Sequence, residues 1–392
     1  MTHYAFEPSS KNKFWDMHLN LGIPMRGNTF NESWRRYSKY IDSNLFRPWS
    51  PGGRIINDYK GYDIYFVDGN LRHLSSKFDA DISYQMTDDI NEINFPDNLL
   101  DSYPMGVLSL SGLRSELEID VKSNSNHELH IKLDDKEFAS SSFIHINVGE
   151  NSKINIVWHL DSLESSFSLP FIVMNLEKNA KASNSFLYTV DSSSSNFPTV
   201  FYNLKDGASV YSHNSVNSSG YFRKDMFSYI DGSGCNFADE SISLFGDGFG
   251  EIINHIEHSK PESKSIQNVR TLAYGGGVGS WQGMAKVYEN CENTDAEQNH
   301  KGLILSPDAK IHMKPQLEIL TDDVVCGHGA SLGRLDDESI QYMMSRGIKK
   351  ELAKKMLVEA FINASFSEVN LSELIEVSIS DNINKVLNLI EE

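Results

Sequence analysis

The segment SSFIHINVGENSK, Ser141 to Lys153, sets a pattern that the chain then repeats. Two further copies follow, LPFIVMNLEKNAK (Leu169 to Lys181) and FPTVFYNLKDGAS (Phe197 to Ser209). Aligning the three places Val148, Leu176 and Leu204 in one column, at two equal steps along the chain. Apolar residues alternate before each column position, which is typical of strands with one buried face.

The column continues further along the chain. Ile230 joins it after a slightly shorter step, and Leu305 falls in it at a distance close to three more steps. In each copy a polar or glycine turn and then a small residue follow the column position. These small residues are Ser152, Ala180, Ala208, Gly234 and Ala309. Strands and turns at a fixed period, without helices between them, indicate a coil whose turns stack on one another.

The repeat therefore predicts a mainly β protein whose core, residues 105–334, is a parallel β-helix. A β-sandwich also has regularly spaced strands, but nothing in that fold requires one column at steps of nearly constant length. A coil needs covered ends, because its terminal strands otherwise expose backbone groups and apolar surface. Residues 1–104 are interpreted as an N-terminal helical region with a hairpin, and residues 335–392 as a C-terminal helical module.

Local signals define these flanking regions. Helical spacing predicts helices over 14–19 and 31–45, and the Asp68-Gly69 pair predicts the two-residue turn of a hairpin over 62–74. Acidic residues that begin at Asp336 predict a helix start, and Gly347 predicts its end. A second helix is expected from Lys349, with its apolar face formed by Leu352, Met356, Ala360 and Phe361.

The composition restricts the classes of partner. The chain has 392 residues, 40% of them hydrophobic, and 35 basic against 54 acidic residues give a net charge of −19. Such a surface excludes nucleic acid as the expected partner. The start MTHYAFEPSSKNKFW does not resemble a secretory signal and no apolar run is long enough for a bilayer, so we expect a cytoplasmic protein without membrane contact. Three widely separated cysteines argue against a disulfide framework, and Cys235 and Cys291 are expected to be small buried residues.

Two motifs invite functional interpretations that their context does not support. The glycine cluster Gly275 to Gly279 lacks the Lys-Ser/Thr of a phosphate loop and the spacing of a dinucleotide fingerprint, so it predicts a tight bend. This chain is therefore expected to bind no nucleotide. His255 and His258 are three residues apart, which on a strand directs them to opposite faces, so we interpret them as surface or turn histidines.

Cys326-Gly327-His328 is the strongest candidate site. Residues i and i+2 of a strand project to the same face, so the thiol and the imidazole should point the same way. Two ligands cannot complete a tetrahedral site, so bound iron or zinc would need further ligands from another chain. Packing within the strand, and a nucleophilic pair with Asp322 or Asp323 as the orienting group, remain open at this point.

The residues around this pair resemble a known family. The run KPQLEILTDDVVCGHGASLGRLDDESIQYMMSRGI, Lys314 to Ile348, is similar to the signature region of the SufB/SufD family of iron-sulfur cluster assembly proteins, on its SufD side. Asp295, Gln298 and Asn299 also fit the pattern, as does Leu21 to Pro24 near the start. The match covers both ends and the last third of the chain, while the middle matches in its repeat character.

The resemblance implies a right-handed parallel β-helix that pairs with that of SufB, and a C-terminal module that binds the ATPase SufC. It implies a non-catalytic scaffold at whose SufB interface a transient Fe-S cluster is built, with His328 as a candidate ligand and Cys326 beside it. For SufC contacts, position in the chain suggests Met343, Arg346 and Gly347. The resemblance leaves open whether a reduced flavin binds the complex and whether the isolated chain forms a homodimer.

Several alternatives are kept. The SufB pattern has a functional cysteine where this chain has Asp308-Ala309-Lys310, and a Glu-His-Glu where this chain has glycines beside His328. A SufB-type or homodimeric scaffold is therefore the secondary interpretation. A carbohydrate-active β-helix enzyme, with paired carboxylates such as Asp322 and Asp323, is a more remote one. A metal-free interaction protein is the third.

Overall fold

The computed structural model describes residues 61–75, 81–87, 109, 112–113, 116–136 and 138–363. The predicted helices over 14–19 and 31–45, and everything beyond residue 363, lie outside these residues. The division into three segments stays a prediction. None of the described helices is long and apolar enough to cross a membrane.

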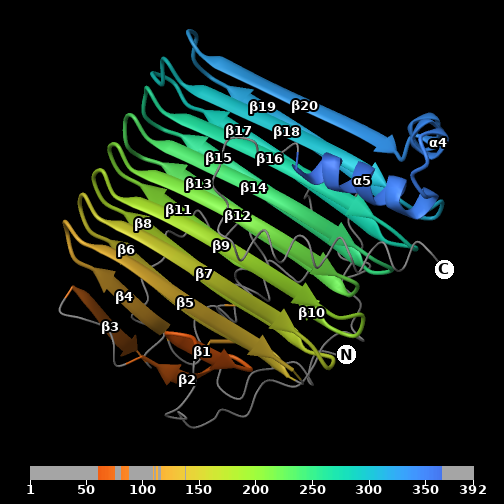
Figure 1. Cartoon of the computed structure of the whole chain (residues 1–392). Helices are drawn as coiled ribbons and strands as arrows, with labels where there is room; N and C mark the ends of the chain where they lie inside the picture. Colours follow the sequence, from red (N-terminus) through yellow and green to blue (C-terminus); the bar gives the residue numbers. More distant parts are fainter. Residues whose placement is uncertain are drawn as a thin grey trace, which may run out of the picture.

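Two ten-stranded sheets make up the described body (Figure 1). Sheet 1 runs in the order β2 (Asn70–Leu74), β1 (Ile64–Val67), β5 (Asn126–Asp135), β7 (Lys153–Ser162), β9 (Lys181–Val190), β12 (Ser209–Ser218), β14 (Asn236–Phe245), β16 (Lys264–Ala273), β18 (Asp295–Ile304) and β20 (Val325–Arg334). Sheet 2 runs in the order β19 (Lys310–Ile319), β17 (Val278–Val287), β15 (Phe249–His258), β13 (Tyr221–Ile230), β10 (Ser195–Asn196), β8 (Phe167–Leu176), β6 (Ala139–Val148), β4 (Glu116–Val121) and β3 (Ile82–Thr87). β11 (Thr199–Leu204) follows β10 and also pairs with β8 and β13.

The winding of the chain confirms the parallel β-helix and excludes the sandwich. From β5 onward consecutive long strands lie in alternate sheets, and each pairs in parallel with the strand one full coil away, as β7 does with β9. Antiparallel pairing among the described strands is confined to β1 with β2 and β3 with β4. A sandwich would instead pair neighbouring strands antiparallel. Each coil therefore consists of one strand in each sheet and two turns.

The predicted hydrophobic column is confirmed over its first four members. Val148 pairs with Leu176, Leu176 with Leu204, and Leu204 with Ile230. All four are buried at the end of their strands in sheet 2. Beyond Ile230 the column passes to His258, Val287 and Ile319.

The placement of Leu305 in this column is wrong. Leu305 directly follows β18, which belongs to sheet 1, whereas the column lies in sheet 2. The later steps of the column, from His258 to Val287 and then to Ile319, are longer than the first ones, because the turns lengthen toward the end of the coil. Counting along the chain at a constant step therefore ends at a residue of the opposite sheet.

The buried small residues follow one turn of the coil, with two corrections. Ser152, Ala180 and Ala208 are buried immediately before strands of sheet 1. The next member is Cys235 rather than Gly234, and its thiol donates to the carbonyl of Lys205 in the coil below, at 3.1 Å. Ala309 is buried but precedes β19, so it belongs to the other turn. Cys235 and Cys291 are both fully buried, as predicted.

Two local predictions in the body can be checked directly. Gly275, Gly276 and Gly277 lie in the bend between β16 and β17, while Gly279 lies in β17. A Cβ on Gly277 would lie 1.9 Å from the Gly246 carbonyl oxygen, so the tight bend is confirmed. His255 and His258 do face opposite ways, but His258 is not a surface residue. It is fully buried in the column and its Nε2 lies 2.8 Å from the Ser265 hydroxyl. Burial lowers the pKa of His258 to about 4.

The hairpin and the C-terminal helices adjoin the coil. Asp68 and Gly69 have φ of 46° and 72° in the turn between β1 and β2, as predicted, and β1 pairs in parallel with β5. Helix α4 (Asp337–Ser345) starts at the Asp336 cap, and Gly347 follows it with φ of 87°. Helix α5 is Lys350–Asn363.

Helix α5 crosses the outer face of sheet 1 (Figure 1). Its buried residues Val358 and Ile362 form a cluster with residues of β14, β16 and β18, and the Arg270 guanidinium lies 5.2 Å from the Phe361 ring. The expected apolar face is wrong except for Phe361. Leu352 and Met356 are exposed, 50% and 42%, because the sheet selects the opposite side of the helix.

Candidate functional site at the open end of the coil

The last coil of the described structure is open. β20 is the edge strand of sheet 1 and β19 that of sheet 2, and nearly all of β20 is exposed. The interior of earlier coils is covered by the coil that follows, but here the side chains that face inward reach a rim. The candidate pair lies on β20.

Cys326 and His328 point to the same side of β20, as predicted, and that side is the interior of the coil. Cys326 pairs in register with Ala296, and His328 with Gln298. Ala296 and Gln298 are both buried inside the preceding coil. Parallel neighbours in register project alike, so the thiol and the imidazole continue these inward rows. Cys326 is half-buried at the rim and His328 is exposed.

The backbone beside His328 is unobstructed. A Cβ placed on Gly327 or Gly329 would meet no atom within 4 Å. These positions lie on the outer side of β20, opposite the imidazole. An incoming backbone could therefore approach the edge closely from this side.

The Cys326 thiol is not an activated nucleophile. Burial raises its pKa, and the charge of Asp295 adds to that effect, while a backbone hydrogen bond from Ala296 opposes it. A raised pKa leaves less thiolate at neutral pH. Asp322 and Asp323 are exposed in the turn between β19 and β20, and no hydrogen bond or ion pair within the described residues joins either of them to His328. The arrangement lacks the orienting group that a nucleophilic pair needs.

The pair can instead offer one sulfur and one nitrogen donor. No group of three or more His, Cys, Asp or Glu residues able to hold a metal ion occurs in the part of the chain that the structure describes. A tetrahedral or cluster site needs about four donors. The rim therefore provides half of such a site at most.

The sequence analysis assigned no role to the polar residues directly below the rim: Gln298 was noted only as part of the family pattern, and His300 was not noted. Gln298 is buried and neither of its amide atoms has a hydrogen-bond partner among the described residues. His300 is also buried, with Nε2 2.8 Å from the Thr271 hydroxyl and its ring 5.0 Å from that of Trp281. Burial, and then the charge of Arg270, lower the pKa of His300 to about 3, so the ring is neutral. Side chains alternate between the two faces of a strand, so along DAEQNHKG (295–302) an inward Ala296 would have placed both Gln298 and His300 inward as well.

The residues suggested for SufC contacts lie on or after α4. Met343 is half-buried, and Arg346 and Gly347 are exposed. The Arg346 guanidinium lies 5.3 Å from the Tyr342 ring. The two helices also expose four large apolar side chains: Tyr342, Met344, Leu352 and Met356.

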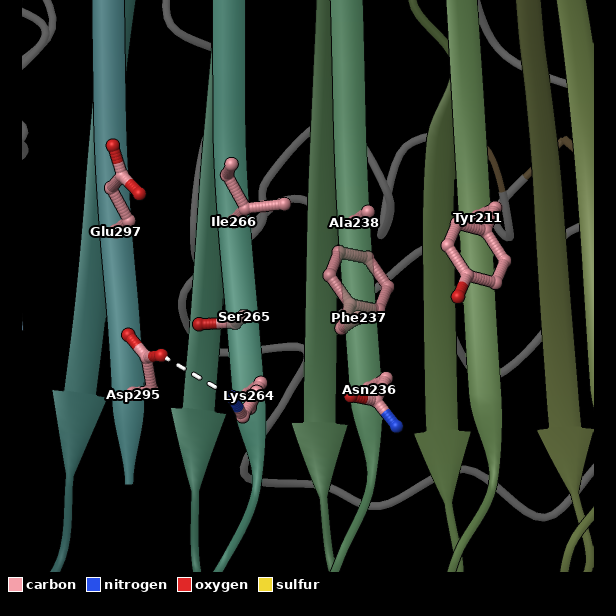
Figure 2. A pocket seen from close by; sticks show the side chains of 9 residues that line it. All are labelled: Tyr211, Asn236, Phe237, Ala238, Lys264, Ser265, Ile266, Asp295 and Glu297. Carbon is pink, nitrogen blue, oxygen red and sulfur yellow. Dashed lines mark ion pairs between the residues drawn. The ribbon is translucent and has the colours of Figure 1, made fainter. Parts of the chain in front are cut away.

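A groove lies on the outer face of sheet 1, which is the face turned away from the interior of the coil (Figure 2). It encloses about 240 Å³ where Ala238 leaves a gap between Tyr211 and Ile266. Lys264 and Asp295 form an ion pair of 3.7 Å at one side of it. These residues are on the outer face, so the groove is separate from the rim, and neither Asp322 nor Asp323 lines it.

Comparison with known proteins identifies the family. Residues 131–361 match the family described as SUF system FeS cluster assembly, SufBD core domain. The chain is 27% identical over 220 residues to the iron-sulfur cluster assembly protein SufD of Escherichia coli K12, covering 55% of this chain and 52% of that protein. It is 37% identical over 89 residues to SufD of Bacillus subtilis 168, covering 23% and 20%. It is 30% identical over 129 residues to an iron-sulfur cluster assembly SufBD family protein of Mycobacterium leprae, covering 31% and 33%.

The family match covers well over half of this chain and nearly all of the coil. It includes β20 with Cys326 and His328, as well as α4 and most of α5. The matched part spans about half the length of the Escherichia coli relative and a third or less of the other two. The chain belongs to the SufBD family of the SUF system for FeS cluster assembly.

Proposed function

We propose that this chain is a non-catalytic scaffold subunit of the SufD type, in a cytoplasmic complex with SufB and the ATPase SufC. Its open coil end pairs with SufB, its C-terminal helices bind SufC, and a nascent Fe-S cluster is built at the SufB interface. The cluster is cargo rather than a resident cofactor. The observation that carries this proposal is the placement of Cys326 and His328 at the uncovered rim of the coil.

The edge of the last coil supports pairing with a second coil. A long exposed edge strand presents unpaired backbone donors and acceptors, which natural proteins usually cover. β20 has ten residues, and Val325 and Leu332 on it are 72% and 49% exposed. A partner that adds strands here would satisfy the backbone groups and bury these side chains. It would also cover the rim, so a cluster held there would lie at the interface.

The donor count supports a shared site. Cys326 and His328 are two donors of types that iron accepts, and the described residues around them complete no metal site. The remaining ligands then come from the partner. Burial raises the pKa of the Cys326 thiol, and a metal binds the thiolate, so coordination through Cys326 must displace a proton at neutral pH. His328 is therefore the residue to test first.

The exposed apolar side chains of α4 and α5 support a docking role for these helices. Contiguous apolar surface on a protein usually marks an interaction site. Tyr342, Met344, Leu352 and Met356 are each more than 40% exposed, although α5 buries its other side against the coil. A partner that binds here would be held rigidly relative to the rim, since α5 is packed on β14, β16 and β18.

The proposal is tested by coexpressing the chain with SufB and SufC and measuring iron and acid-labile sulfide in the purified complex. His328→Ala should lower both at least as much as the loss of a residue that only orients a ligand, about tenfold or more, if the imidazole is itself a ligand. His130→Ala is the matched control, because His130 lies on the outer face of β5 beside Glu128. Cluster content that His328→Ala leaves at the wild-type level, in an intact complex, would refute a role for the rim.

A further inference from the structure

The amide of Gln298 lies directly below the rim and lacks any partner among the described residues. The side chain is 1% exposed, and neither Oε1 nor Nε2 has a hydrogen-bond partner there. Buried carboxamides in folded proteins are nearly always hydrogen-bonded, and an unpaired one costs free energy. The unpaired amide lies on the strand next to the candidate donors, which points to a hydrogen bond with a side chain at the rim that a change of rotamer alone would form.

The neighbours of Gln298 within the coil each use one polar atom in another hydrogen bond, while Gln267 Oε1 and His300 Nδ1 have no partner among the described residues. Gln267, one coil below in the same inward row, donates from Nε2 to the Met284 carbonyl at 3.0 Å. The Nε2 of His300, the next inward residue on β18, is 2.8 Å from the Thr271 hydroxyl. The neighbour above Gln298 is His328, in register on the next strand. Paired strands are about 4.8 Å apart, which a glutamine side chain spans easily.

We propose that Gln298 is the positioning residue of His328. Its Oε1 accepts a hydrogen bond from one ring N–H of the imidazole, which leaves the other ring nitrogen as the free donor. Metal-binding histidines usually donate their second N–H to an oxygen acceptor in this way, which fixes the tautomer and the ring orientation. The hydrogen bond itself requires only this chain, while its role in holding iron rests on the proposed function.

The hydrogen bond is tested on the full isolated chain with ¹⁵N-labelled histidine, at a pH where His328 is neutral. His328→Ala assigns the signal, and the tautomer ratio of His328 is then compared between variants. Gln298→Met removes the acceptor at similar length and should change the ratio about fivefold, which corresponds to one hydrogen bond of about 1 kcal/mol. Gln298→Glu keeps an acceptor and should preserve the ratio.

The control is Gln267→Met, which makes the same replacement one coil below. It should leave the tautomer ratio of His328 unchanged, because Gln267 is not in the adjacent strand. An unchanged ratio in Gln298→Met, or an equal change in Gln267→Met, would overturn the assignment.

The same variants, coexpressed with SufB and SufC, connect the hydrogen bond to cluster assembly. Gln298→Met should lower iron and sulfide about tenfold, and Gln298→Glu should restore most of the loss. If His328→Ala keeps full cluster content, the proposed function fails, while the tautomer ratio still decides the role of Gln298. If His328→Ala loses the cluster and Gln298→Met keeps it, the positioning role is refuted and the proposed function stands.

Discussion

Replacing Lys224 by methionine should destabilise the coil strongly, because it leaves a buried carboxylate without its cation. Lys224 and Asp239 are both fully buried inside the coil, with Nζ 3.2 Å from Oδ1. Removing one partner of such a pair costs about 3–5 kcal/mol. Asn214 and Asn254 also donate to the Asp239 carboxylate, at 2.9 and 2.8 Å, so we expect the lower end, about 3 kcal/mol.

The assay is equilibrium urea unfolding followed by circular dichroism, with a double-mutant cycle. Asp239→Asn in the Lys224→Met background removes the unpaired charge and should recover part of the loss, so the two changes should be non-additive by more than about 1 kcal/mol. Leu133→Met is a volume control in the same interior and should cost less than about 1.5 kcal/mol. Additive losses, or a Lys224→Met cost below about 1 kcal/mol, would refute the view that the ion pair holds these coils together.

Three further predictions concern other parts of the chain. Burial raises the pKa of Asp135 to about 7, so the folded state binds more protons than the unfolded state between about pH 4 and pH 7. Stability should therefore fall as pH rises through this window, and Asp135→Asn should flatten that fall in urea titrations at successive pH values; a slope that persists would contradict the assignment. Gly277→Ala should destabilise by about 1–3 kcal/mol, because its Cβ would meet the Gly246 carbonyl oxygen, while Gly276→Ala, whose Cβ comes no closer than 3.7 Å to any atom, should be nearly neutral in thermal unfolding; equal effects would reject the steric explanation. Met356→Glu should weaken SufC binding in a pull-down without lowering the unfolding temperature, and retention of SufC at wild-type levels would remove α5 from that interface.

Hydrophobic spacing predicted the coil because parallel pairing repeats the same chemistry at the same position. The register of Val148, Leu176 and Leu204 is the physical basis of their common column. The same reasoning failed at Leu305, since turns differ in length and a constant step then leaves the sheet. The length of each turn depends on its local backbone geometry, and the spacing of apolar residues in the strands does not predict it.

The remaining differences have a common cause in tertiary context. The apolar stripe of α5 predicted from Leu352 and Met356 was wrong because both helix faces carry apolar residues, and contact with sheet 1 decides which one is buried. The inward positions of Gln298 and His300 were not predicted, because polar residues in inward rows violate the pattern that identified the strands. The common orientation of Cys326 and His328, by contrast, follows from strand geometry and could be predicted from their spacing.

The two ends of the described coil differ in a way that limits how many molecules can join. At the start, the sheets finish in β2 and β3, which have five and six residues and run against their neighbours. At the finish, β20 offers ten residues in the direction of the winding. Short reversed strands are poor templates for extension. If a second coil adds at β20, the short reversed strands at the other end of the described coil do not favour a further addition there, so a pair of coils is expected rather than a fibre.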